Sequence, residues 1–169
     1  SSDGSRVAIG AIQNDGNGSE SGHVRVYQWD GSDWTKLGAD IDGEAANDNS
    51  GHSVSISSDG SRVAIGAIEN DGGGDQSGHV RIYEFKSGSW SQVGVDINGG
   101  ASGDNLGRSV SISSDGSRVA IGGNGNDGNG NGYNSGHVRI YSWDGSSWNQ
   151  LGADIDCEAA DDQSGWTCL

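Results

Sequence analysis

Three copies of one sequence unit make up the chain, and each begins at Ser-Ser-Asp-Gly: residues 1–56, 57–112 and 113–169. The first two copies align without a gap and are identical at most of their positions. Thirty-two glycines, an apolar content of only 31% and a net charge of −15 would by themselves be typical of disorder. Apolar positions that stay in register over a 56-residue period instead indicate one structural unit repeated along the chain.

Each copy contains four short segments in which apolar and polar or small residues alternate, as they do along a β-strand. In the order of a blade they are 53–56, 6–11, 23–27 and 34–37, all numbered as they occur in the first copy. Asp-Gly pairs typical of tight hairpins separate the first segment from the second and the third from the fourth. No stretch shows helical periodicity. The sequence therefore predicts an all-β protein of three four-stranded repeats, the pattern of β-propeller blades.

Three blades are fewer than the four to eight that close a propeller. We therefore expect the chain to need further blades, either from a longer polypeptide or from a homo-oligomer. In a two-chain, six-blade ring, residues 165–169 of the partner would supply the first strand that the first copy lacks. The mismatch between these residues and the strand they would replace favours the longer polypeptide.

Four consecutive segments, at the end of the first unit and in the second, together resemble an FG-GAP repeat: Gly-His-Ser-Val-Ser-Ile at 51–56, Asp-Gly at 59–60, Val-Ala-Ile-Gly-Ala at 63–67 and Gly-His-Val-Arg-Ile-Tyr at 78–83. FG-GAP repeats form the blades of the integrin α-subunit head and of many secreted microbial and algal proteins. The resemblance implies a propeller at the cell surface or outside the cell, with a role in adhesion or ligand binding. In integrin-like members an aspartate-rich calcium loop joins the first two strands of a blade. In this chain the same hairpin has only one carboxylate, so we do not expect the family's calcium site at this position.

A different loop, rich in Asn, Asp and Gly, recurs in all three copies and is the candidate calcium site. Oxygen-bearing side chains with intervening glycines suit a hard cation, although the bidentate acid of an EF-hand is missing. We predict at most weak Ca²⁺ binding there, and the alternative is a flexible loop without metal. The candidate ligands are Asp15, Asn17, Asp71, Asp75, Asp127, Asn129 and Asn131.

Two further sets of polar residues recur. An acidic stretch runs from Asp40 to Asp48, is weakened in the second copy and returns in the third, and we interpret it as a solvated loop. Histidines 23, 79 and 137 each precede an arginine by two residues, so both side chains share one face of a strand. We expect them to make a repeated structural contact with an acidic loop of a neighbouring blade.

Trp34, Trp90 and Trp148 occupy one position of the repeat. They either fill the space between blades or line an outer rim, where they would stack on sugar rings. Cys157 and Cys168 are the two cysteines, both in the third copy, and we expect them to form a disulfide.

With nine basic and 24 acidic residues, the chain repels phosphate backbones and anionic membranes. No apolar run is long enough for a membrane helix, and no catalytic motif stands in a suitable context. We therefore expect an extracellular, non-catalytic binding or adhesion module that recognises a cell-surface or matrix protein or a glycan. The alternatives are a propeller scaffold of a glycan-acting enzyme and a structural cell-wall or matrix repeat protein.

Overall fold

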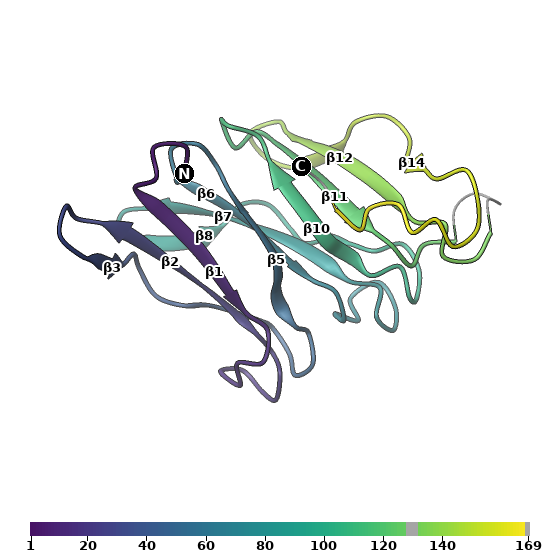
Figure 1. Cartoon of the computed structure of the whole chain (residues 1–169), viewed down its shortest axis with the longest axis horizontal. Coiled ribbons are helices and arrows are strands. Elements are labelled where there is room, and N and C mark those ends of the chain that lie inside the picture. The colour runs from purple at the N-terminus through teal and green to yellow at the C-terminus, as the bar shows by residue number, and fades with distance from the viewer. Residues whose placement is uncertain (128–131, 168–169) are drawn as a thin grey trace.

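The computed structural model describes residues 1–127 and 132–167, and these fold into three antiparallel β-sheets that follow one another along the chain (Figure 1). The first sheet comprises β1 (Arg6–Ala11), β2 (His23–Trp29), β3 (Trp34–Lys36) and β4 (Ile41–Asp42). The middle sheet comprises β5 (Ser50–Ile56), β6 (Arg62–Ala67), β7 (His79–Lys86), β8 (Ser89–Gln92) and β9 (Ile97–Asn98). The third sheet comprises β10 (Leu106–Ile112), β11 (Arg118–Gly123), β12 (His137–Trp143), β13 (Trp148–Gln150) and β14 (Ile155–Asp156). The all-β class and the propeller-type blades predicted from the sequence are confirmed.

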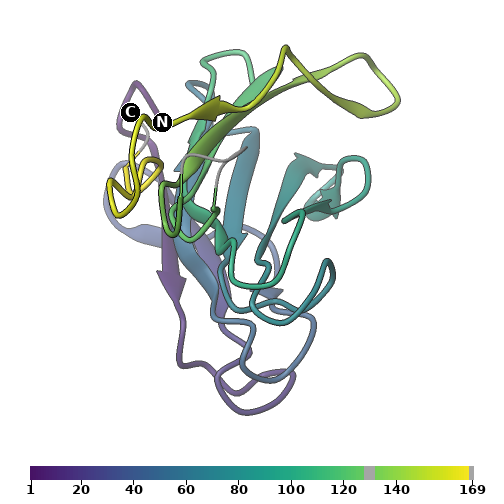
Figure 2. The same ribbon diagram turned by 90° about the vertical axis from the view of Figure 1, so that its right-hand side faces the viewer.

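Within the described residues there is no helix, and so none that could cross a membrane. Strands β1, β5 and β10 lie side by side in Figure 1. Figure 2 shows the outer hairpins of the middle and third sheets extending from that line and spreading apart.

The predicted fourth strand, 34–37, corresponds to β3, but the sequence missed a second short strand along the same outer line of each sheet. In the first sheet β3 and β4 both pair with β2, in the middle sheet β8 and β9 pair with β7, and in the third sheet β13 and β14 pair with β12. A glycine with positive φ stands between the two short strands each time: Gly38 (φ 79°), Gly94 (φ 79°) and Gly152 (φ 76°). This left-handed conformation, which glycine adopts without strain, turns the chain out of the sheet.

The sheets are offset from the sequence units 1–56, 57–112 and 113–169. Strand β5 lies at the end of the first unit but pairs with β6 of the second, and β10 pairs in the same way with β11. The Ser-Ser-Asp-Gly hairpin joins β5 to β6, where Asp59 Oδ1 accepts the backbone N–H of Ser61 at 2.9 Å. Strand β1 has β2 on one side and no strand on the other among the described residues.

The apolar core lies between the sheets as two thin layers. One layer joins Val24, Val26 and Ile41 of the first sheet to Val63 and Ile65 of the middle sheet. The other layer joins the equivalent residues one repeat later: Val80, Ile82 and Ile97 with Val119 and Ile121. Each layer is one repeat of the same contact, which explains how a chain with so few apolar residues builds a core.

Glycines at the centre of the sheets allow this close stacking. Gly66 of β6 lies directly against the backbone carbonyl of Gly107 in the next inner strand, where a Cβ would overlap that carbonyl. Gly10 with Gly51, and Gly122 with Gly165, repeat the contact. A glycine at each of these positions is therefore what lets neighbouring sheets approach so closely.

Polar links between sheets also repeat. The indole Nε1 of Trp90 donates to the carbonyl of Leu37 in the first sheet at 2.8 Å, and Trp148 donates to Val93 in the middle sheet at 2.8 Å. In the opposite direction, Arg6 Nη1 donates to the Gly60 carbonyl at 3.1 Å, and Arg62 Nη1 donates to the Gly116 carbonyl at 3.0 Å. These two kinds of hydrogen bond, from tryptophan and from arginine, therefore repeat at both sheet–sheet interfaces.

Candidate binding site between the sheets

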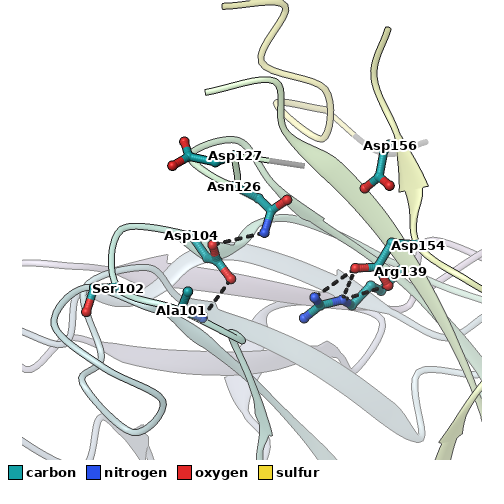
Figure 3. Close-up of a pocket in the computed structure, with 9 residues that line it drawn as sticks. Ala101, Ser102, Asp104, Asn126, Asp127, Arg139, Asp154 and Asp156 are labelled. Carbon is teal, nitrogen blue, oxygen red and sulfur yellow. Dashed lines mark hydrogen bonds and ion pairs between the residues drawn. The ribbon is translucent and has the colours of Figure 1, made fainter. Parts of the chain in front are cut away.

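A polar cavity of about 210 Å³ lies between the loops of the middle and third sheets (Figure 3). Nine residues line it: Ala101, Ser102, Asp104, Gly125, Asn126, Asp127, Arg139, Asp154 and Asp156. The middle sheet contributes the loop that follows β9. The third sheet contributes the loop after β11, strand β12 and the segment around β14. No aliphatic side chain larger than alanine is among them.

Arg139 is fixed in the wall of the cavity by Asp154. Its Nε donates to Asp154 Oδ1 at 3.0 Å and its Nη2 donates to Oδ2 at 2.8 Å, a bidentate pair. The hydrogen bonds from Arg139 lower the pKa of Asp154, while partial burial opposes this shift. Asp154 is therefore ionised throughout the neutral range.

Asp104 connects the two sheets at the base of the cavity. The residue is 3% exposed. Its Oδ2 accepts the backbone N–H groups of Gly100 at 2.9 Å and Ala101 at 3.0 Å, and its Oδ1 accepts Asn126 Nδ2 at 3.0 Å. Asp48 makes the equivalent link, accepting Asn70 Nδ2 at 3.2 Å. Interpreting the acidic stretch as a solvated loop was therefore wrong at this position, because the carboxylate pairs with N–H donors that would otherwise be buried alone.

Next to the cavity-lining Ala101, Gly100 stands where the first repeat has Glu44. At the interface of the first and middle sheets, Glu44 Oε1 lies 3.3 Å from Arg81 Nη1, and its Oε2 lies 3.9 Å from His79 Nδ1. At the other interface a Cβ on Gly100 would lie 3.5 Å from Arg139 Nη2, with no side chain to continue toward it. The carboxylate of Glu44 thus fills the space beside Arg81 at one interface, whereas no side chain fills the equivalent space beside Arg139 at the other.

The three repeated histidines are buried, as a structural role requires. His79 Nδ1 lies 3.9 Å from Glu44 Oε2 of the preceding sheet without a hydrogen bond to it, so the predicted contact with a neighbouring acidic loop is one of proximity in this copy. His23 instead lies 3.9 Å from Asp40 in its own sheet. Burial, and next the nearby Arg81, lower the pKa of His79 to about 4. Burial and Arg139 likewise lower the pKa of His137.

The predicted calcium loops are closed by their own aspartates. The Oδ1 atoms of Asp15, Asp71 and Asp127 each accept a backbone N–H across the loop, at 2.9, 2.8 and 3.0 Å. Asn17 donates from Nδ2 to the Gly43 carbonyl at 2.7 Å, and Asp75 is exposed. Asn129 and Asn131 lie outside the described residues. The structure does not gather these candidates around a common point, and weak calcium binding stays a prediction.

Metal-ligating side chains do converge in two other places within residues 1–127 and 132–167. These are His23 with Asp40 and Asp42, and His79 with Glu44 and Asp96. An arginine already serves each group, since Arg25 Nη2 lies 2.9 Å from Asp40 and Arg81 contacts Glu44. In each group one of the two carboxylates is therefore already paired with an arginine.

The three tryptophans have two different environments. Trp90 and Trp148 pack between sheets against the two apolar layers and donate to backbone carbonyls there, the packing role considered from the sequence. Trp34, in the first sheet, is 43% exposed. Of the predicted disulfide, Cys168 lies outside the described residues. Cys157 Sγ donates to Asp162 Oδ2 at 3.3 Å.

Sequence reasoning missed Arg139, Asp154 and Asp104 as neighbours of one cavity. The available signal was the weakened acidic stretch of the second copy, where Gly100 replaces a glutamate that the first and third copies retain as Glu44 and Glu158. In repeated architectures a substitution confined to one copy marks the place where one interface differs from the others.

Three antiparallel sheets stacked through repeated inter-sheet contacts define the β-propeller class. Residues 34–83, which run from β3 across the inter-sheet loop to β7, match the family profile of the FG-GAP repeat. This part of the chain is an FG-GAP repeat.

No curated protein matches the chain in sequence. Among solved structures, one similar protein is described as a 6-phosphogluconolactonase from Bacteroides uniformis, with a TM-score of 0.51 and 9% identity. Another is the periplasmic gluconolactonase of Pseudomonas aeruginosa, with a TM-score of 0.50 and 18% identity. The alignments cover 85% and 87% of this chain but only 39% and 37% of those chains. At this level of identity the likeness concerns the fold alone.

Proposed function

We propose that the chain is an extracellular, non-catalytic binding module whose cavity between the middle and third sheets takes a polyhydroxylated ligand, a surface glycan. The observation that carries this proposal is the cavity beside Gly100. Carboxylates, an amide, a hydroxyl and a guanidinium surround it, and these are the partners that sugar hydroxyls need. Because Arg139, Asp154, Asp104 and Asn126 already hold one another, ligand binding costs little ordering of side chains.

The charge of the chain supports the choice of ligand class. A net charge of −15 disfavours nucleic acids and anionic membranes, whereas a neutral glycan is indifferent to it. An extracellular location agrees with the FG-GAP repeat and with the secreted proteins that its blades resemble. A cell-surface or matrix protein is the other partner to be tested against the same cavity.

The chief rival is a glycan-acting enzyme, which one observation favours: a buried acid, Asp104, shares the cavity with more exposed ones. A glycosidase needs one of its two carboxyl groups protonated at the working pH. Here Arg139 lowers the pKa of Asp154, and both oxygens of Asp104 accept N–H donors. Asp154 is therefore held ionised, and both oxygens of Asp104 are already occupied as acceptors, which suits binding better than proton donation. A purely structural wall or matrix protein is the remaining alternative.

A glycan array followed by calorimetry on the bound sugar tests the proposal. The decisive variant is Gly100→Glu, which restores the side chain that fills the sister interface. It should weaken binding by at least about tenfold, or about 1.4 kcal/mol. The matched variant Glu44→Gly opens the sister interface and should leave the original site intact.

A blank array together with a positive pull-down from surface extract would replace the glycan by a protein ligand. If both the glycan array and the pull-down were blank, the structural wall or matrix protein would be the remaining function. Release of sugar products from a bound glycan would establish the enzyme.

A further inference from the structure

The first and middle sheets together place one imidazole and two carboxylates around a common point. His79 is the first residue of β7, Asp96 directly precedes β9, and Glu44 lies in the loop that follows β4 of the first sheet. One ligand atom from each of these side chains lies within 4.8 Å of the other two. We call Glu44, His79 and Asp96 the interface triad, because two of its members belong to the middle sheet and one to the first.

His79 faces the triad with a buried nitrogen that the fold leaves unused. The residue is 1% exposed, and its Nδ1 makes no hydrogen bond to any residue that the structure describes. Glu44 Oε2 lies 3.9 Å away from Nδ1, beyond hydrogen-bond distance. A buried polar atom without a partner costs free energy, so such an atom in a folded protein needs an explanation. A cation between Nδ1 and Oε2 would satisfy both atoms.

The spacing of the two atoms suits a zinc-sized ion. Zinc binds imidazole nitrogen and carboxylate oxygen at about 2.0–2.2 Å, which sets two tetrahedral ligands about 3.4 Å apart. The side chain of Glu44 is 45% exposed, so it has the freedom to close the remaining part of the 3.9 Å separation. With Asp96 as the third ligand, the fourth position is left for water, as in zinc sites with three protein ligands.

Asp96 retains a charge that its counterparts share with arginine. In the first and third sheets the equivalent aspartate binds the arginine of its own sheet, at 2.9 and 2.8 Å. In the middle sheet Arg81 turns to the preceding sheet, where its Nη1 lies 3.3 Å from Glu44 Oε1 and its Nη2 donates to the Asp42 carbonyl. Asp96 accepts a hydrogen bond from Gln92 Nε2 at 2.6 Å but forms no ion pair with a described residue. Two carboxylates and one guanidinium thus leave one negative charge at the triad for a cation to neutralise.

The equivalent places in the other sheets are less suitable for a cation. At the interface of the middle and third sheets, Gly100 stands where the first repeat has Glu44, so one of the three ligands is missing. In the first sheet, Asp40 is already held by two cations, Arg25 at 2.9 Å and Lys36 at 2.8 Å. One ion per chain is therefore the expected number.

We infer that the interface triad binds one divalent transition-metal ion, Zn²⁺, which fastens the first sheet to the middle sheet. An imidazole nitrogen with two carboxylates suits zinc, whereas calcium and magnesium prefer sites made of oxygen alone. Arg81, on the other oxygen of Glu44, orients that carboxylate without being a ligand itself. Because the three ligands meet only when the two sheets are stacked, the ion binds the folded chain and stabilises it. This site is distinct from the glycan cavity, which lies at the other interface.

Calorimetric titration of the metal-stripped chain with Zn²⁺ tests the inference. The expected result is one ion per chain. Zn²⁺ at about 100 times its dissociation constant should raise the melting temperature by about 5–11 °C. Calcium or magnesium at the same concentration should produce no comparable rise.

Asp96→Asn and Glu44→Gln are the decisive variants, because each removes the charge of one ligand and keeps the shape of the side chain. Each should weaken Zn²⁺ binding by at least about 100-fold, since even the outer partners of metal ligands are worth about 10–100-fold in affinity. The matched control is Asp75→Asn, which removes one charge from an exposed carboxylate of the same sheet and should bind Zn²⁺ as the wild type does. Circular dichroism of each variant verifies that the sheets remain folded.

The absence of Zn²⁺ binding by the folded wild-type chain would overturn the inference. Binding that survives both ligand substitutions would also overturn it, because the ion would then lie elsewhere. Equal weakening by Asp75→Asn, or several weak ions per chain, would indicate general attraction to an acidic surface and would overturn it as well.

Discussion

His23, His79 and His137 occupy one position of the repeat, and each has an arginine two residues later, yet the arginines have different partners. Arg25 and Arg139 bind aspartates of their own sheets, at 2.9 and 2.8 Å. Arg81 turns instead to Glu44 and to the Asp42 carbonyl of the preceding sheet. The difference follows from the residue that the neighbouring loop offers, so a motif on one strand does not determine its own contacts.

The buried His79 predicts a loss of stability in acid. Burial lowers its pKa in the folded protein to about 4, from an ordinary value of 6.5. Between these values the unfolded chain binds the proton more readily, so the free energy of unfolding falls as the pH drops from about 6.5 to about 4. The lowered pKa of His79 accounts for about 3 kcal/mol of the free energy of unfolding across this pH range. Urea denaturation at a series of pH values measures it.

His79→Gln and His79→Asn are the variants for this measurement. Any packing defect changes their stability equally at all pH values, whereas loss of the titrating group reduces the slope between neutral and acid pH. His137 and His52, whose pKa values burial also lowers, retain their own share of the slope. Variants as pH-dependent as the wild type would show that His79 is accessible to protons in the folded state.

At the scale of strands and sheets, the sequence predicted the inner three strands of each repeat well because their alternation and their Asp-Gly turns are local signals. The division of the outer line was not predicted, because Gly38 could be read as the end of a strand as easily as a kink within it. The cavity was beyond local reasoning altogether. It lies where Gly100 of one sheet faces Arg139 of the next, a pairing that only the stacking of sheets creates.

The close approach of sheets predicts that Gly66→Ala is damaging. The added methyl group would overlap the backbone carbonyl of Gly107, which cannot rotate away as a side chain could. We expect the free energy of unfolding to fall by about 1–3 kcal/mol, measured by urea denaturation. Gly100→Ala is the matched control, since its methyl group would meet its nearest neighbour at 3.5 Å, an ordinary contact. A loss as large for Gly100→Ala would contradict the steric explanation.

At the scale of the whole molecule, the 24 acidic side chains far outnumber the nine basic ones. Several of the basic groups are committed to ion pairs, among them Arg62 with Glu84 at 3.0 Å and Lys36 with Asp40 at 2.8 Å. Most carboxylates therefore repel one another across the surface. Such repulsion destabilises the compact state and weakens as salt shortens its range.

The last prediction separates this screening from specific calcium binding. Raising sodium chloride from about 0.01 M to about 0.1 M shortens the screening length from about 30 Å to about 10 Å. We expect the melting temperature to rise by about 2–4 °C, the effect of about 1 kcal/mol in a chain of this size.

Calcium in the low micromolar range, added at constant ionic strength, should produce no further rise in the melting temperature. The loops of Asp15, Asp71 and Asp127 are closed by backbone N–H donors, and a site no tighter than about 10⁻⁴–10⁻³ M is almost empty at that concentration. Calorimetric scans with calcium, magnesium and a chelator at matched ionic strength decide the matter, because stabilisation by micromolar calcium alone would require a tight site that these loops do not display.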